Sequence, residues 1–228
     1  QQVVGQPDSR SREHCLPPLA PPPAGCRGDA GVAMWVAGHA RASDWKAFRG
    51  GALRNGNATE QAFQPQGSAF APQWTFASGS AFVSSPVVSG GAVFIGDKAG
   101  RVHGINALTG KALWQFSTQG RITASPAVAD GVVYAASCDG NLYALDALKG
   151  TEKWRLLLGS QNLSSPVVIN GLLFCATGFP KTDVYCLDIA SGAPAHKWKT
   201  SVGQFVFSTP VVAGTEVFAA GNNGKIFC

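Results

Sequence analysis

Short apolar runs bounded by Gly-containing turns recur through residues 70–228. One stretch contains the runs 122–129, 132–136, 141–146 and 151–156, which are rich in Val, Tyr, Leu and Trp. Asp130-Gly131 and Asp139-Gly140 separate the first three runs. Such runs predict antiparallel strands joined by tight hairpins, because a type I′ turn needs positive φ at both central residues. The 3.6-residue apolar period is absent, so we expect no helix in this region.

The runs belong to a repeat. Trp74, Trp114, Trp154 and Trp198 are spaced 40, 40 and 44 residues apart. A Ser-Ser-Pro-like motif keeps the same spacing at 84–86, 124–126, 164–166 and 208–210. A shared period of about 40 residues with four short strands per unit is typical of a β-propeller blade.

The fold class predicted is therefore all-β, a β-propeller of four-stranded antiparallel blades. A single four-stranded sheet cannot bury a core, whereas sheets stacked around an axis cover one another's faces. Complete blades are predicted at 81–117, 122–158 and 163–200, and a partial one begins at 206. The small motif residues fit innermost strands near the axis, where a Pro at a sheet edge is tolerated.

Three stretches resemble the pyrroloquinoline-quinone-type (PQQ-like) repeat propellers, whose pattern is Ala-x-Asp-x-x-Thr-Gly-x-x-x-Trp. They are 104–114, 144–154 and 186–198, the last with two extra residues. The resemblance implies that the Trp docks between neighbouring blades and that an Asp or Asn and a Gly hold its turn. The residues so implied are Trp74, Trp114, Trp154, Trp198, Asn106, Asp146, Asp188, Gly110, Gly150 and Gly192.

Propellers of this family usually close with seven or eight blades. Residues 44–50 and 54–56 are similar to the segment that often precedes the first blade, and we expect a lead-in over 44–80 that ends in an outer strand near 73–77. That strand either finishes the blade begun at 206, which gives a four-bladed ring, or belongs to a larger ring. We expect the repeats of 81–228 to be part of the larger ring.

The resemblance implies little about catalysis, because only some members bind the quinone. The chain has no vicinal Cys-Cys pair of the kind found in alcohol-oxidising members, and its acidic residues mostly occupy turns. We therefore expect a non-catalytic scaffold that binds a protein partner, with no catalytic, cofactor-binding or metal-binding residues. The alternatives are part of a dehydrogenase holding PQQ and Ca²⁺ in its central funnel, and the propeller of an adenylate-forming enzyme.

Composition excludes several other roles. Residues 1–43 are rich in Pro and Ala and predict a disordered tail or linker. The chain has no run of 18 apolar residues that would span a membrane. Its net charge of +5 comes partly from arginines that precede the blades, and the basic residues within the blades are scattered singly over turns and outer strands, which argues against nucleic-acid binding.

Single histidines and cysteines offer little chemistry. The six cysteines include no Cys-x-x-Cys motif, and the histidines are not spaced to complete a zinc site. Cys175 and Cys186 fall on adjacent predicted strands, where we expect two buried free thiols rather than a disulfide. His103 takes the place of Tyr143 in the next blade and is expected to be a packed ring.

The third repeat carries two insertions. It has residues 178–183 where the second repeat has only 138–140, and a later turn is enlarged at 193–196. Insertions in repeat folds map to loops that often bind partners. Phe179, Lys181, Asp183 and His196 are the predicted binding surface, with a loop extension of no function as the alternative.

Overall fold

A computed structural model describes residues 31–34, 72–159, 161–178 and 180–228, and all regular structure in these ranges is β-strand. β1 (Gly31–Met34) and β2 (Trp74–Ala77) form a two-stranded sheet. Blade 1 contains β3 (Val87–Ser89), β4 (Ala92–Gly96), β5 (Arg101–Asn106) and β6 (Ala112–Ser117). Blade 2 contains β7 (Ala127–Ala129), β8 (Val132–Ala136), β9 (Asn141–Asp146) and β10 (Glu152–Leu157). Blade 3 contains β11 (Val167–Ile169), β12 (Leu172–Ala176), β13 (Asp183–Asp188) and β14 (Ala195–Ser201), and blade 4 contains β15 (Val211–Ala213), β16 (Glu216–Ala220) and β17 (Ile226–Phe227).

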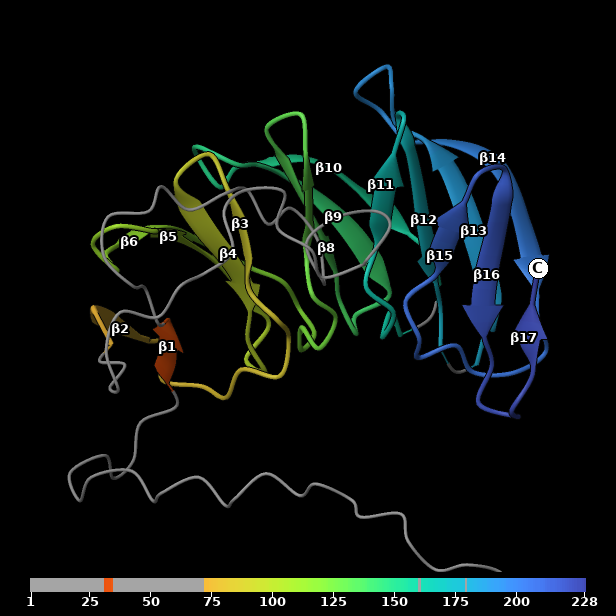
Figure 1. Ribbon diagram of the computed structural model, residues 1–228, viewed down its shortest axis with the longest axis horizontal. Helices are drawn as coiled ribbons and strands as arrows, with labels where there is room; N and C mark the ends of the chain where they lie inside the picture. Colours follow the sequence, from red (N-terminus) through yellow and green to blue (C-terminus); the bar gives the residue numbers. More distant parts are fainter. Residues whose placement is uncertain (1–30, 35–71, 160, 179) are drawn as a thin grey trace, which may run out of the picture.

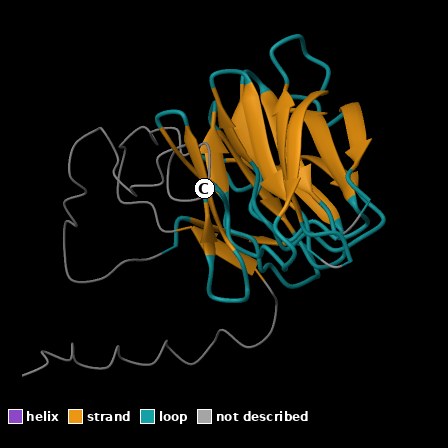
Figure 2. Cartoon of the chain, turned by 90° about the vertical axis from the view of Figure 1, so that its right-hand side faces the viewer, coloured by secondary structure: helices purple, strands orange, loops and turns teal. Residues whose placement is uncertain are grey.

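Each blade is an antiparallel meander whose strands pair in chain order. The four blades stand beside one another as an open arc, with blade 1 and the β1–β2 pair at one end and blade 4 at the other (Figure 1). Strands and loops make up the whole described chain (Figure 2). The predicted propeller blades are confirmed, and the sheets do not close into a four-bladed ring. β1 lies within the stretch expected as a tail, and the lead-in motifs at 44–56 lie outside the described residues.

The hairpins between first and second strands have the predicted geometry. Asp130 and Gly131 have φ of 49° and 72°, and Asn170 and Gly171 have 50° and 73°. Positive φ at both positions is the type I′ turn. The turn at Asp139-Gly140 differs from the expectation, because only Gly140 has positive φ and its N–H bonds to Ser137 O, 3.2 Å away.

Indole side chains join neighbouring blades. Trp74 Nε1 donates to Ala107 O of blade 1 at 3.0 Å, and Trp114 Nε1 donates to Ala147 O of blade 2 at 2.9 Å. A Cβ placed on Gly110 or on Gly150 would overlap the indole of Trp74 or of Trp114, respectively. These turns therefore need Gly for close approach, as well as for their φ of 69° and 68°.

A side-chain acceptor holds each of these turns. Asn106 Oδ1 accepts from the N–H of Leu108 and Thr109, and Asp146 Oδ1 accepts from the N–H of Leu148 and Lys149. In blade 3, Asp188 Oδ1 accepts from Ala190 N at 3.1 Å. Gly192 has no atom within 4 Å of an added Cβ, so the enlarged turn lacks the Gly–indole contact of the other two blades.

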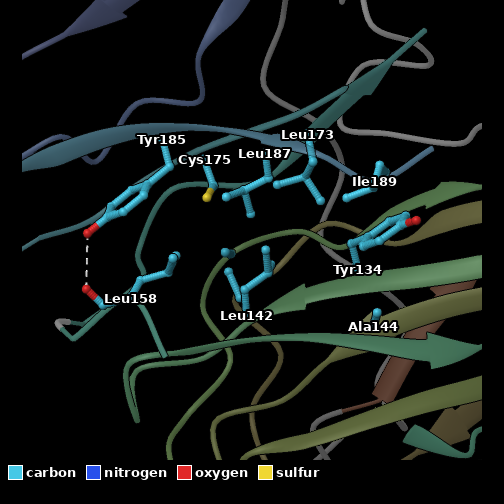
Figure 3. Packing of buried hydrophobic residues seen from close by; sticks show 11 residues of the cluster. Tyr134, Leu142, Ala144, Leu158, Leu173, Cys175, Tyr185, Leu187 and Ile189 are labelled. Atoms are coloured by element: carbon cyan, nitrogen blue, oxygen red, sulfur yellow. Dashed lines mark hydrogen bonds between the residues drawn. The ribbon is translucent and has the colours of Figure 1, made fainter. Parts of the chain in front are cut away.

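Apolar side chains fill the space between blades. Figure 3 shows Cys175, Leu187 and Tyr185 of blade 3 facing Leu142 and Leu158 of blade 2. A separate cluster joins blades 1 and 2, and two smaller clusters join blades 3 and 4. Each blade is therefore buried on the faces that meet its neighbours, which explains its nearly continuous apolar runs.

The Ser-Ser-Pro motif precedes the innermost strand rather than opening it as predicted, because the Pro cannot donate to the sheet. In blade 1 its first serine closes the blade, since Ser84 Oγ donates to Gly96 O at 2.8 Å and accepts from Gly96 N. Its second serine links blades: Ser85 N donates to Ser125 Oγ at 2.8 Å, and Ser125 N donates to Ser165 Oγ at 2.9 Å.

The two thiols of blade 3 lie on opposite faces of its sheet. Cys175 is directly opposite Tyr185, whereas Cys186 is opposite Phe174. Because successive strand residues point to opposite faces, Cys175 packs against blade 2 and Cys186 packs toward blade 4. The expected buried free thiols are confirmed. Burial raises the pKa of Cys175 to about 12, so its sulfur stays protonated and unreactive.

Among the described residues, one buried polar side chain has no hydrogen-bond partner. Asn162 is 1% exposed, and neither its Oδ1 nor its Nδ2 bonds to any residue that the structure describes. The same repeat position holds Ile122 in blade 2 and Val206 in blade 4, both fully buried. The amide thus occupies an apolar position between blades, where an unsatisfied polar group costs about 1–3 kcal/mol.

We expect Trp114→Ala to lower the free energy of unfolding by about 3 kcal/mol, because it removes an indole packed between two blades. Trp198 is 41% exposed, and no N–H bond to a following blade is present among the described residues. Trp198→Ala is therefore the matched control and should cost less than half as much. Urea unfolding followed by circular dichroism measures both. Equal losses would contradict the docking role of Trp114.

We expect Asn162→Ile to raise the free energy of unfolding by about 1–3 kcal/mol, since it removes an unpaired buried amide. The reciprocal Ile122→Asn should lower it by a similar amount. Thermal denaturation of the two variants and the wild type measures both changes. An unchanged or lowered midpoint for Asn162→Ile would mean that the amide has a partner in solution.

Candidate interaction face

The blades have two distinct ends. At the loop face, hairpins between second and third strands bond to the connections between blades, as in Cys138 N to Arg121 O at 3.0 Å and Gly178 N to Gln161 O at 2.7 Å. At the opposite end, tight turns stack on each other, as in Ala147 N to Gly131 O at 2.9 Å. The docking Trp N–H groups point to carbonyls at this second end. Of the two insertions of blade 3, the extended hairpin at 178–182 lies on the loop face, whereas the enlarged turn between β13 and β14 lies at the opposite end.

A ring and a carboxylate meet near the loop face in each of three blades. His103 Nε2 lies 3.0 Å from Asp97 Oδ2, Tyr143 Oη donates to Asp139 Oδ2 at 2.7 Å, and Tyr185 Oη donates to Asp183 Oδ2 at 3.2 Å. The three rings occupy equivalent positions, because they pair with Ile95, Ala135 and Cys175 of the second strands. Each pair closes the hairpin of its own blade.

The ring–carboxylate pair of blade 1 has an additional charged partner, Arg101. Arg101 donates from Nε to Asp97 Oδ2 at 2.8 Å and from Nη2 to Ser78 O at 2.7 Å. Burial acts to raise the pKa of Asp97, but the hydrogen bonds from His103 and Arg101 outweigh it and leave the pKa below its ordinary 3.8. Burial lowers the pKa of His103, despite the neighbouring carboxylate. The ring is therefore neutral, and its Nε2–H donates to an ionised carboxylate.

In the tyrosine–carboxylate pairs of blades 2 and 3, burial and the neighbouring carboxylate both favour the neutral ring. Burial and Asp139 together raise the pKa of Tyr143 to about 12. Burial and Asp183 do the same for Tyr185. Both phenols therefore remain protonated donors at neutral pH. None of the three pairs has the geometry of a nucleophile beside a free base, because each acid already accepts hydrogen bonds.

These carboxylates do not fit a PQQ and Ca²⁺ site. Calcium requires several oxygen ligands converging on one point. Asp97, Asp139 and Asp183 stand one per blade, and each is bonded to the ring of its own blade. In the described parts of the chain, no three His, Cys, Asp or Glu side chains gather closely enough to hold a metal ion.

The predicted binding residues do not form one surface. Lys181 is exposed on the extended hairpin of blade 3, whereas Asp183 is buried in β13 and Phe179 lies outside the described residues. His196 lies on the exposed edge strand β14, with its ring 5.9 Å from that of Tyr185. The hairpin at 178–182 thus remains the candidate, with Lys181 as its exposed charge.

Together, the sheets, the docking indoles and the turn motifs define a β-propeller of PQQ-like repeats, present as four successive blades of an open arc. The chain belongs to the family described as outer membrane protein assembly factor BamB, which matches residues 61–228. No curated protein sequence matches the chain.

Solved structures share the fold at low sequence identity. BamB from Moraxella catarrhalis is 18% identical with a TM-score of 0.57, over 67% of this chain and 48% of that one. Quinohemoprotein alcohol dehydrogenase from Comamonas testosteroni is 21% identical with a TM-score of 0.58, over 69% and 27%. The designed protein Ika4 is 18% identical with a TM-score of 0.56, over 65% and 89%. The chain thus spans about half of the BamB structure.

We expect stability to fall between neutral pH and mildly acidic pH because of His103. Its pKa is lowered in the folded state, so the unfolded chain binds the proton more readily once the pH falls below about 6.5. The loss from Asp97 appears only at lower pH, below its ordinary 3.8. Urea unfolding at pH 7.5 and pH 5.5 measures the first effect. His103→Tyr, which installs the ring of blade 2, should reduce the drop, whereas His196→Gln should not.

Proposed function

We propose that the protein is a non-catalytic propeller scaffold that binds another protein through the loop face of blade 3. The observation that supports this proposal is the contrast between the polar groups that all blades share and the hairpin that differs in blade 3. The polar groups shared by the blades are bonded to one another, whereas the hairpin at 178–182 departs from the repeat and exposes Lys181. A variable loop held by a regular set of strands is suited to binding a partner.

The family description supports the same interpretation, because it names BamB as an assembly factor. The similarity to an alcohol dehydrogenase supports only the fold, at 21% identity. The described carboxylates do not converge on a metal, so we propose no bound cofactor. Separately, no helix of the described residues is long and apolar enough to cross a membrane.

The test replaces residues 178–182 by the shorter hairpin of blade 2, which removes the extension and leaves the frame intact. Proteins captured by the immobilised chain from an extract of its source are compared with those captured by the variant. We expect specific partners to be lost while the thermal midpoint changes little. Lys111→Glu, an exposed charge on a blade 1 turn, is the control and should retain them. Retention of every partner by the shortened variant would contradict the proposal.

A second measurement addresses the enzyme alternative directly. The full chain is titrated with PQQ in the presence of Ca²⁺ while the quinone absorbance and the reduction of a dye by alcohols are followed. We expect neither saturable binding nor turnover. Saturable binding coupled to dye reduction would replace the scaffold proposal with a quinoprotein function.

A further inference from the structure

Each blade has a seam at the loop face, where the connection that enters the blade meets the hairpin between its second and third strands. These hairpins lie on the lower side of the arc in Figure 1. One backbone bond closes the seam in each of blades 1 to 3: Lys98 N donates to Ala81 O at 2.9 Å, Cys138 N to Arg121 O at 3.0 Å, and Gly178 N to Gln161 O at 2.7 Å. The same bond therefore holds the seam in three successive blades.

One exposed basic side chain stands at each of these three seams. Lys98 belongs to the hairpin of blade 1, whereas Arg121 belongs to the connection that enters blade 2. Lys181 belongs to the extended hairpin of blade 3, and its Nζ lies against the connection, 2.8 Å from the position of a Cβ built on Gly159. The positive charge thus recurs at every seam, although the residue that carries it does not keep one position in the repeat.

No exposed acid accompanies these basic groups. Among the described residues of the loop-face segments of blades 1 to 3 (78–86, 97–101, 118–126, 137–141, 158–166 and 177–183), every exposed charged residue is basic. The acids of these segments are bonded within their own blades. Asp97 is fully buried and lies 2.7 Å from Arg101 Nη2, and Asp183 lies 3.8 Å from Lys199 Nζ. A partner that approaches this face therefore meets only positive charges at its surface.

The opposite end of the blades has a different charge pattern. Asp130 is exposed there, as are Lys111 and Lys149. Lys153 Nζ lies 3.9 Å from the carboxylate of Asp146. The opposite end thus presents both signs of charge, whereas the loop face of blades 1 to 3 presents one.

We propose that the loop face of blades 1 to 3 binds an acidic segment of a partner protein, whose carboxylates pair with Lys98, Arg121 and Lys181. This inference rests on the proposed scaffold function and names the chemistry of its partner. A surface with one sign of charge attracts a segment of the opposite sign and disfavours basic partners. Val83, which is 48% exposed beside the seam of blade 1, offers an apolar contact for the same segment.

This surface suits a protein segment better than a nucleic acid. Binding to phosphates by charge uses a clustered basic face, whereas the seams offer one basic group per blade. Between these groups the connections expose Gln119 and Gln161, whose amides both donate and accept hydrogen bonds. Amides of this kind can pair with the backbone of a bound peptide while the basic groups pair with its acids.

The first test measures the binding of a short fluorescein-labelled peptide, in which Glu alternates with Ser and Leu, to the full chain by fluorescence anisotropy. We expect saturable binding that weakens as salt is added, because exposed charges are screened. The combined variant Lys98→Gln, Arg121→Gln and Lys181→Gln should weaken binding about tenfold, since it removes three ion pairs. The peptide with Gln in place of Glu should not bind.

The matched control changes the same number of basic groups at the opposite end. Lys111→Gln, Lys149→Gln and Lys153→Gln together lower the net charge equally and should weaken binding less than about twofold. Equal losses in the two combined variants, or no binding of the Glu peptide, would overturn the proposal. Single-stranded polyuridylate is titrated in parallel. If it binds more tightly than the peptide and is lost in the loop-face variant, the face belongs to nucleic acid and the proposal is wrong.

The second test separates this inference from the scaffold function on which it rests. Partners captured by the immobilised chain are compared between the loop-face variant and the variant with the shortened hairpin of blade 3. We expect both variants to lose the same partner, and the segment of that partner that cross-links to the chain to be acidic. A partner lost with the hairpin but kept by the loop-face variant would overturn the acidic-segment inference alone. If neither variant loses a partner, the scaffold function through blade 3 fails as well.

Discussion

Burial between neighbouring sheets is the constraint on which this structure depends. A four-stranded sheet of three- to seven-residue strands has two apolar faces, and neither can be covered from within the sheet. The indole is the side chain that spans the gap at the outer edge, because it combines a large apolar area with one N–H donor. The donor finds a carbonyl at the turn of the next blade, and a glycine in that turn lets the ring approach. The repeat length in the sequence, the position of the Gly turn and the packing of the indole are therefore all consistent with the same distance between neighbouring blades.

The same constraint explains why the repeats contain so little chemistry. Serines that resemble nucleophiles are donors and acceptors within and between blades, and acids that resemble ligands close hairpins. These groups cannot be released for catalysis without loosening a blade, since a buried polar group left unpaired is costly. Variation is tolerated at an exposed loop such as the extended hairpin of blade 3. A rigid set of blades of this kind is better suited to binding a partner than to catalysing a reaction.

Much of the fold could be predicted from the sequence because Trp114, Gly150 and the Asp-Gly turns act locally and repeat in phase. The ring–carboxylate pairs could not be predicted, since Asp97, Asp139 and Asp183 precede their rings by six, four and two residues respectively. No fixed spacing links them, and only the pairing of strands brings them together. The opposite orientation of Cys175 and Cys186 likewise follows from the strand pairing of blade 3, which is the same as in blade 2 although the hairpin between the paired strands is two residues longer. The unpaired amide of Asn162 has no sequence signal except its mismatch with Ile122 and Val206.

The serine bonds around the axis have a direction. Ser85 N–H depends on the hydroxyl of Ser125, and Ser125 N–H depends on the hydroxyl of Ser165, so blades 2 and 3 each complete the backbone of the blade before them. Loss of blade 2 or of blade 3 would leave a backbone donor of the preceding blade without its acceptor and would also expose an apolar face. Unfolding of these three blades is thereby coupled, and they should melt as one cooperative unit rather than blade by blade, in contrast to loosely coupled repeat arrays.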